Sequence, residues 1–443
     1  METATINQNQ SAEVSKPKAV AKADKHIWGI MLMLCVVSII ELYSASSREV
    51  ASSSLGVMGP LLRHMAMLVG GLGITWVIAR RHYSDFVGFT LGFVALSVAM
   101  MVYVMFFGDY INGARRSLTI FGIGLFPAEF LKISAVLMIA LIMAACQNQD
   151  RPGISGKGVV YSGLVVVVFS ALLFTQGMTN TALLAAISFS MLVIAGAKFK
   201  HLGMLLLAFV AAGAVAIGAL YFVDVKAENL TPADATQTEV GSRKKISRLD
   251  TWIARLERHQ AHKTDAVRPW ELPATGDNRQ EVLSYMAQAH GGIMGVGPGN
   301  SREAARLPLA FSDYIYAIVV EELGLVGGVF VLLLYLWLLG RAAGIVSRCH
   351  ATYPALLVLG MAVMVAFQAL FHMAIVTGVG PVSGQPLPLI SKGGTSILVT
   401  CIAFGIMLSV SRTATSKESK SQDKRDEMDT LPDQMSGENM MQL

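Results

Sequence analysis

Residues 314–340 read YIYAIVVEELGLVGGVFVLLLYLWLLG, and the charged residues in this run are Glu321 and Glu322. A helix needs about 20 mostly apolar residues to cross the hydrocarbon core of a bilayer. A charged side chain inside such a helix is costly unless the protein supplies a partner. We therefore predict a transmembrane helix here and interpret the two carboxylates as members of a structural polar network, with a functional site as the alternative.

Comparable apolar runs recur along the chain. They begin near Ile27, Leu61, Phe86, Glu129, Val159, Thr181, Leu202, Pro354 and Thr395. The 443-residue chain is 53% hydrophobic and 15% charged, whereas soluble domains are about 25% charged. This pattern predicts an all-α polytopic membrane protein with about ten transmembrane helices. The formal net charge of +5 comes from basic residues at the chain ends and between the runs, so we expect no nucleic-acid partner.

The distribution of Lys and Arg predicts the orientation in the membrane. Basic residues occupy alternate short loops and both ends of the chain, and the positive-inside rule then places both termini in the cytoplasm. Residues 1–26 are polar without a cleavable signal pattern, so we expect a cytoplasmic tail that leads into a membrane domain at 27–411. Residues 412–443 alternate charged and small polar side chains, which predicts a disordered cytoplasmic tail.

A large extracytoplasmic loop, residues 224–313, is predicted between the seventh and eighth helices. Between Arg243 and His259 its apolar residues recur at helical spacing among many Lys and Arg. Such a helix would lie on the outer leaflet of the membrane, and a solvated basic helix is the alternative. A second helical stretch, 281–289, breaks at Gly291 and Gly292.

Charged residues on the expected outer face are candidates for chemistry. Arg115 and Arg116 follow the third span, and Asp313 precedes the eighth among apolar neighbours. A carboxylate in a partly dry cleft can act as a general base, while an ordinary helix N-cap is the alternative for Asp313. Glu129 and Lys132 lie three residues apart on one helix face, as a fold-stabilising ion pair or as part of a site.

Two broken segments flank these residues. Residues 295–300, GVGPGN, superficially match a nucleotide-binding loop, but no βαβ unit is predicted around them, so we reject a dinucleotide site. Residues 380–395 are rich in Pro and Gly. Because irregular backbone at membrane depth must be walled by protein, we expect this segment to line a cavity.

Several short motifs keep a fixed order along the chain. They are YSAS at 43–46, NGARR at 112–116, PAE at 127–129 with Lys132, GPGNS at 297–301, Asp313 with EELG at 321–324, FQ at 367–368, PLP at 386–388 and GGTS at 393–396. In these motifs the chain resembles the FtsW/RodA (SEDS) family of membrane glycosyltransferases, and it is most similar to the cell-division branch, FtsW. The resemblance covers most of residues 27–411.

The chain also departs from the family pattern. Phe311 and Lys392 stand where the family usually has His and Tyr. His372 stands where the family usually has Asn after the FQ pair. Further departures are Phe126 for Gln, Leu309 for Glu, Ser312 for Thr, and residues 177–181, GMTNT, for the PDLGT element. The surroundings of Asp313 are therefore less polar than usual, but the arginine doublet, the Glu/Lys pair and the aspartate all remain.

The resemblance implies that the chain polymerises lipid II into glycan strands and releases undecaprenyl pyrophosphate. It implies Asp313 as the catalytic residue. It also implies substrate binding by Arg115, Arg116, Glu129, Lys132, Asn300, Ser301, Ser391 and Lys392. A divalent cation, Mg²⁺ or Mn²⁺, would assist by bridging pyrophosphate oxygens, although no dedicated metal cluster is visible in the sequence.

The resemblance further implies a place and partners. The place is the bacterial inner membrane at the division septum. The partners are lipid II, an undecaprenyl-pyrophosphate-linked glycan, membrane lipid, a class B penicillin-binding protein and other division proteins. Two alternatives remain: a lipid II flippase that uses the charges of Glu129, Lys132, Glu321 and Glu322, and a scaffold without catalysis.

Overall fold

The computed structural model describes residues 23–45, 58–111, 114–120, 123–147, 154–229, 257, 278–307, 310–349, 351–380 and 383–429. Its helices are α1 (Lys25–Ala45), α2 (Met58–Arg80), α3 (Asp85–Phe107), α4 (Pro127–Ala145), α5 (Gly156–Phe174), α6 (Met178–Ile194), α7 (Phe199–Asn229), α9 (Arg279–Gly291), α10 (Ile315–Val346), α11 (Thr352–Val376) and α12 (Gly394–Asp429).

The predicted spans are confirmed. Within the described residues, 8 helices are long and apolar enough to cross a membrane, and shorter apolar helices occupy Met178–Ile194 and Phe199–Val215. Each begins within a few residues of a predicted start. The reason is physical: an apolar run long enough to span a bilayer can satisfy its backbone hydrogen bonds in lipid only as a helix.

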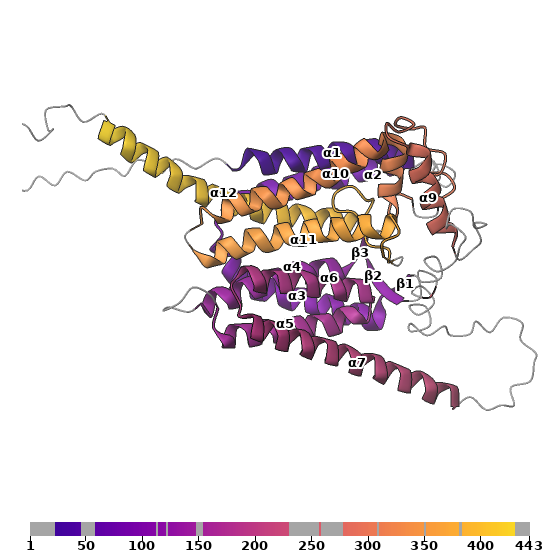
Figure 1. Ribbon diagram of the computed structural model, residues 1–443, viewed down its shortest axis with the longest axis horizontal. Helices are drawn as coiled ribbons and strands as arrows, with labels where there is room; N and C mark the ends of the chain where they lie inside the picture. Colours follow the sequence, from indigo (N-terminus) through magenta and orange to yellow (C-terminus); the bar gives the residue numbers. More distant parts are fainter. Residues whose placement is uncertain are drawn as a thin grey trace, which may run out of the picture.

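The helices run roughly side by side, with a small sheet and α9 at one end of the bundle (Figure 1). The start of α1 and the C-terminal part of α12 lie at the opposite end. Helix α11 packs against α10, α12, α4 and α6 and is therefore central to the fold. Helix α7 lies at the edge of the bundle, where it packs against α5 and α6.

The sheet was not predicted. Strands β1 (Asp109–Ile111), β2 (Ala114–Ile120) and β3 (Ile123–Leu125) form an antiparallel sheet in the order β1-β2-β3. Residues 114–116, which were expected to lie in a loop, thus belong to β2, where Arg115 pairs with Tyr110. Strand β3 leads into α4, whose first turn holds Pro127, a residue suited to that position because its missing N–H is not needed there.

Helix α10 contains a break at Gly324, where φ is 72° and ψ is −176°. The glycine-rich segment after α9 fills this break. Val296 N–H donates to the Glu321 carbonyl at 3.0 Å, and Leu325 N–H donates to the Gly292 carbonyl at 3.0 Å. A Cβ at Gly324 would collide with the carbonyl of Ile293. Both the left-handed φ and this close backbone approach require glycine at position 324.

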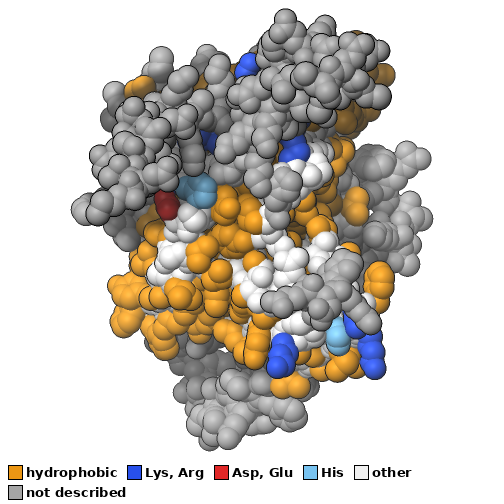
Figure 2. Space-filling view, turned by 90° about the vertical axis from the view of Figure 1, so that its left-hand side faces the viewer, with side chains coloured by type: hydrophobic (Ala, Val, Ile, Leu, Met, Phe, Trp, Pro, Cys, Tyr) orange, Lys and Arg blue, Asp and Glu red, His pale blue; other side chains and the backbone are white. Residues whose placement is uncertain are grey.

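The end opposite the sheet carries the basic loops. Figure 2 views this end and shows more Lys and Arg than Asp and Glu among its described side chains. This pattern fits a cytoplasmic face under the positive-inside rule.

Three predictions about tails and loops have different outcomes. Helix α12 continues through Arg412 to Asp429, and residues 430–443 lie outside the described residues, so the disordered tail over 412–443 stays a prediction. The predicted helix at 281–289 is confirmed as α9 (Arg279–Gly291). The basic stretch Arg243–His259 lies outside the described residues apart from Glu257, so its interfacial placement stays a prediction.

Candidate functional site

A buried polar cluster connects α4 to α11 near the sheet end. Lys132 Nζ lies 2.7 Å from Glu129 Oε1 and donates to Gln368 Oε1 at 3.2 Å. Gln368 Nε2 in turn donates to Glu129 Oε2 at 3.4 Å. Lys132 is fully buried and Glu129 is 6% exposed, so each charge depends on the other for compensation. The sequence predicted the ion pair, and the structure adds Gln368 as its third member.

The segment 383–393, called here the 383–393 loop, connects this cluster to Asp313. Its Pro386 carbonyl accepts a hydrogen bond from Gln368 Nε2 at 3.4 Å. A Cβ at Gly384 would lie 3.0 Å from Asp313 Oδ2, so the loop backbone passes directly beside the carboxylate. The expectation that this irregular segment is walled by protein fits its contacts with α10 and α11.

Asp313 is half-buried at the start of α10. Ser312 Oγ donates to Asp313 Oδ1 at 2.7 Å, which orients the carboxylate. Ser391 Oγ donates to the Ser312 carbonyl at 2.7 Å and accepts from Leu387 N–H at 2.7 Å. The N-cap of α10 is Tyr314, so the structure does not support a capping role for Ser312 or Asp313.

The arginine doublet lies on β2 at the same end of the bundle. A Cβ at Gly177 would lie 3.7 Å from Arg116 Nη2, which places that guanidinium beside the start of α6. One turn along α6, Asn180 Oδ1 accepts a hydrogen bond from Gln385 Nε2 at 3.0 Å. A short series of contacts thus connects Arg116 through α6 to the 383–393 loop and Asp313.

Sequence reasoning missed part of this connection. His372 Nδ1 donates to the Gln385 carbonyl at 2.6 Å, and Thr395 Oγ1 donates to the Gly124 carbonyl at 2.9 Å while accepting from Phe126 N–H at 3.1 Å. These residues fix the 383–393 loop and the sheet to the helices. A usable signal was the cluster of departures from the family pattern at Phe126, residues 177–181 and His372.

Asn300 and Ser301 bind α10 and the glycine-rich segment that precedes it. Ser301 Oγ donates to Glu321 Oε2 at 2.5 Å, and Ser44 Oγ donates to Glu322 Oε1. Asn300 is exposed and donates to the Val296 carbonyl at 3.1 Å. The structural-network interpretation of the two glutamates therefore fits their surroundings, and Ser301 belongs to that network.

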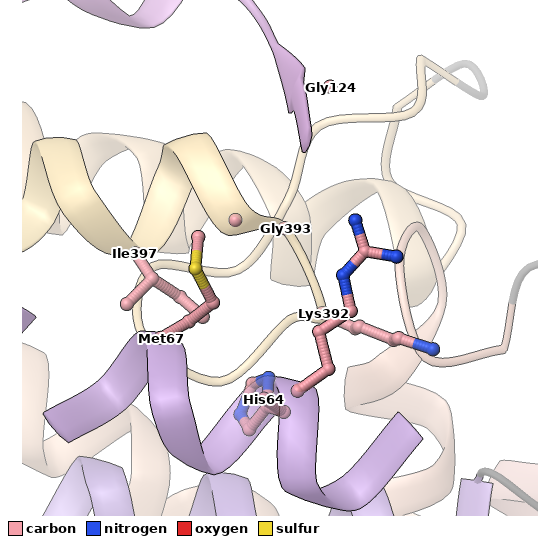
Figure 3. A pocket seen from close by; sticks show the side chains of 8 residues that line it. His64, Met67, Gly124, Lys392, Gly393 and Ile397 are labelled. Atoms are coloured by element: carbon pink, nitrogen blue, oxygen red, sulfur yellow. The ribbon is translucent and has the colours of Figure 1, made fainter. Parts of the chain in front are cut away.

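A cavity of about 160 Å³ opens between α2, β3 and the start of α12, and Lys392 lines it. Figure 3 shows His64 and Met67 on α2, Ile397 on α12 and Gly124 on the strand side of this cavity. Arg63 also lines it. The sequence pointed to Lys392 and missed both Arg63 and His64.

The described residues offer no site for a metal held by the protein. In that part of the chain no three His, Cys, Asp or Glu side chains converge to hold an ion. Asp313 accepts a hydrogen bond from Ser312 Oγ and lies beside the backbone of the 383–393 loop. Among the described residues, the side chains around Asp313 thus do not form a protein-held Mg²⁺ or Mn²⁺ centre.

Comparison with known proteins identifies relatives over nearly the whole chain. Residues 24–416 match the family model of FtsW, RodA and SpoVE, which is described as a cell cycle protein. A probable peptidoglycan glycosyltransferase FtsW of Trichlorobacter lovleyi is 28% identical over 403 residues, with 89% of this chain and 95% of the relative covered. Stage V sporulation protein E of Bacillus subtilis is 26% identical, with 86% and 95% covered.

Solved structures share the fold. One chain comes from a peptidoglycan synthase complex described as coordinating polymerization and crosslinking; it has a TM-score of 0.62 at 21% identity, with 88% of this chain and 98% of that chain covered. The rod shape determining protein RodA of Thermus thermophilus has a TM-score of 0.58 at 19% identity, with 89% and 98% covered. The all-α fold expected from the sequence is thus the fold of these proteins.

Proposed function

The chain belongs to the FtsW/RodA/SpoVE family of cell cycle proteins, and we propose that it is a peptidoglycan glycosyltransferase that polymerises lipid II during cell division. It is a multi-pass membrane protein. The names of its relatives as probable peptidoglycan glycosyltransferases support the activity. The arrangement around the 383–393 loop is the observation that carries the proposal, because it gathers Asp313, the Glu129–Lys132 pair and Arg116 at one end of the bundle.

In the proposed reaction, the 4-hydroxyl of an acceptor lipid II sugar attacks the anomeric carbon of the glycan attached to undecaprenyl pyrophosphate. Asp313 takes the proton from that hydroxyl as the new glycosidic C–O bond forms. The bond between the anomeric carbon and the pyrophosphate oxygen breaks, and its electron pair leaves with the pyrophosphate. Arg115 and Arg116 stabilise the charge that develops on this leaving group.

The other candidate residues support this chemistry in different ways. The buried Glu129–Lys132–Gln368 cluster holds the 383–393 loop against α11, so its role is to position the loop. Ser391 orients the backbone next to Asp313 through its bond to the Ser312 carbonyl. Ser301 and Asn300 shape the segment that fills the break in α10.

The proposed setting is the bacterial inner membrane, with both termini cytoplasmic and the sheet end facing outward. A class B penicillin-binding protein is the proposed partner, since a structural relative comes from a peptidoglycan synthase complex. Lipid II, undecaprenyl-pyrophosphate-linked glycan, other division proteins and membrane lipid complete the set of proposed partners.

The deciding experiment is reconstitution on labelled lipid II, with and without a class B penicillin-binding protein. A polymerase yields a ladder of glycan strands and releases undecaprenyl pyrophosphate. A flippase yields transbilayer movement of labelled lipid II without a ladder, and a scaffold yields neither. Absence of glycan product from well-folded protein in the presence of the partner would overturn the proposed activity.

A further inference from the structure

Two positions at which the sequence departs from the family pattern contact each other. Phe311 stands in place of the usual His, and Lys392 stands in place of the usual Tyr. The Lys392 ammonium lies 4.9 Å from the centroid of the Phe311 ring, within the roughly 6 Å over which an aromatic face attracts a cation. Lys392 N–H also donates to the Phe311 carbonyl at 2.8 Å. Phe311 and Lys392 therefore contact each other through both side chain and backbone.

The Lys392 side chain lines a cavity suited to an anion. Arg63 and His64 line the same cavity, and no Asp or Glu is among the described residues around it. Figure 3 shows Lys392 on one side of this space and Met67 with Ile397 on the other, with His64 on α2 between them. Arg and Lys side chains offer donors and no acceptors, so they suit a negatively charged group, while the Met67 thioether and the Ile397 side chain provide an apolar surface.

We propose that Lys392 and Arg63 bind a phosphate of a lipid-linked ligand in this cavity, and that Phe311 positions the Lys392 ammonium for that contact. This inference rests on the proposed function, which supplies lipid II and undecaprenyl pyrophosphate as ligands of this chemistry. An apolar floor beside cationic walls suits a phosphate attached to a hydrocarbon chain better than a free, fully hydrated anion. Arginine adds a planar fork that matches phosphate oxygens.

The cavity wall is fixed before a ligand arrives. Ser38 Oγ donates its one proton to the Ile390 carbonyl at 3.2 Å. In its second bond, at 2.7 Å, Ser38 must therefore accept from His64 Nε2. These two bonds attach α1 and α2 to the 383–393 loop two residues before Lys392. His64 is accordingly a positioning residue, and little ordering remains for Lys392 on binding.

The test measures binding of undecaprenyl pyrophosphate to the full chain in phosphatidylcholine nanodiscs. Lys392→Met and Arg63→Gln each remove a charge-assisted contact and should weaken binding about tenfold. Lys392→Arg should stay within about threefold of the unaltered protein, which shows that the site folds. Lys200→Met, at an exposed position on α7, is the matched control and should change nothing. Unaltered affinity in both Lys392→Met and Arg63→Gln would overturn the proposal.

The contribution of Phe311 is read from a double-mutant cycle in the same assay. Phe311→Leu keeps an apolar side chain and removes the aromatic face, so it should weaken binding about threefold. Combined with Lys392→Met it should add nothing, because the ring acts through the ammonium. Additive losses would overturn the positioning role of Phe311.

A second arm separates the two sources of a lipid-linked phosphate. Phosphatidylglycerol added to the nanodiscs should not compete with undecaprenyl pyrophosphate. Competition that disappears in Lys392→Met would assign the cavity to a phospholipid headgroup and overturn its assignment to the substrate.

The proposed binding site and the proposed enzyme activity can be refuted independently of each other. A chain that makes no glycan yet binds undecaprenyl pyrophosphate through Lys392 would refute the enzyme proposal and support the site. A chain that makes glycan but binds undecaprenyl pyrophosphate equally well without Lys392 would support the enzyme proposal and refute the site.

Discussion

Asp313 is the residue on which the proposed chemistry depends most directly. Its carboxylate is oriented by Ser312 and faces the backbone of Gly384. Replacing it with Asn keeps the shape and removes the base, so Asp313→Asn should lower glycan synthesis by at least about 100-fold, as expected when a general base is lost. The exposed Asp85→Asn, at the opposite end of the bundle, is the matched control. Near-normal glycan ladders from well-expressed Asp313→Asn protein would refute the assignment.

Arg116 offers a different test, because its proposed role is to stabilise the charge on the leaving pyrophosphate. The side chain is half-buried beside Gly177. Arg116→Ala should raise the KM for lipid II or lower kcat by about tenfold, the cost of one charge-assisted contact, while the melting temperature changes little. Parallel kinetic and thermal-unfolding measurements check this. A loss of stability that matches the loss of activity would indicate a structural role instead.

For single residues, the charged members of the candidate site could be predicted from the sequence, but their neutral hydrogen-bond partners could not. Glu129, Lys132 and Asp313 stand out because charges beside apolar runs are costly and hence rare. Gln368 and Gln385 are neutral, and their importance arises only when the fold brings α6, α11 and the 383–393 loop together. Glu41, fully buried on α1 with no hydrogen-bond partner for its carboxylate among the described residues, was missed although it lies in an apolar run.

At the scale of elements, α4 depends on the polar cluster that attaches it to α11. Lys132→Met would leave the Glu129 carboxylate buried without its cation, so unfolding free energy should fall by about 3–5 kcal/mol. Adding Glu129→Gln should recover part of that loss, because a neutral amide is cheaper to bury than a lone charge. Thermal unfolding in detergent measures both. The control is Lys157→Met at the start of α5; equal destabilisation by the single and double variants would contradict the expected coupling.

Elements differ in how far sequence could predict them. The membrane helices followed from hydropathy, since bilayer thickness fixes the length of an apolar run. The sheet could not be predicted in this way, because strands of three to seven residues carry little periodic signal. The break at Gly324 was also hidden: its φ is set by the backbone of residues 291–297, which lie about 30 residues earlier in the chain.

Across the whole molecule, the two ends of the bundle carry different polar groups. The sheet end gathers the carboxylate, the arginine doublet and the cationic cavity. At the opposite end, Asp24 joins three membrane helices: it accepts from Arg341 Nε on α10 at 2.7 Å, and its N–H donates to Ser411 Oγ on α12 at 3.1 Å. Its other carboxylate oxygen accepts from the N–H groups of His26 and Ile27 and so caps α1.

This junction makes stability depend on pH. Burial alone would raise the pKa of Asp24, but the hydrogen bonds from Arg341 and the backbone outweigh it and lower the pKa below 3.8. A carboxyl group whose pKa is lower in the folded state stabilises the fold fully above its unfolded value, and this contribution is lost as pH falls through the folded value. We therefore expect thermal stability to hold at neutral pH and to decline below about pH 4.

The variant Asp24→Asn tests the junction directly. At pH 7 it should cost roughly 2–3 kcal/mol, less than a fully buried pair, because the Arg341 side chain is 30% exposed. The cost should shrink below about pH 4, where the unaltered protein protonates its own carboxyl group. Thermal unfolding in detergent across this range measures it, with Asp85→Asn as the exposed control. Because the junction lies far from the sheet end, folded Asp24→Asn protein should polymerise normally at 25 °C. A loss of turnover without unfolding would show that the end opposite the sheet is coupled to the site.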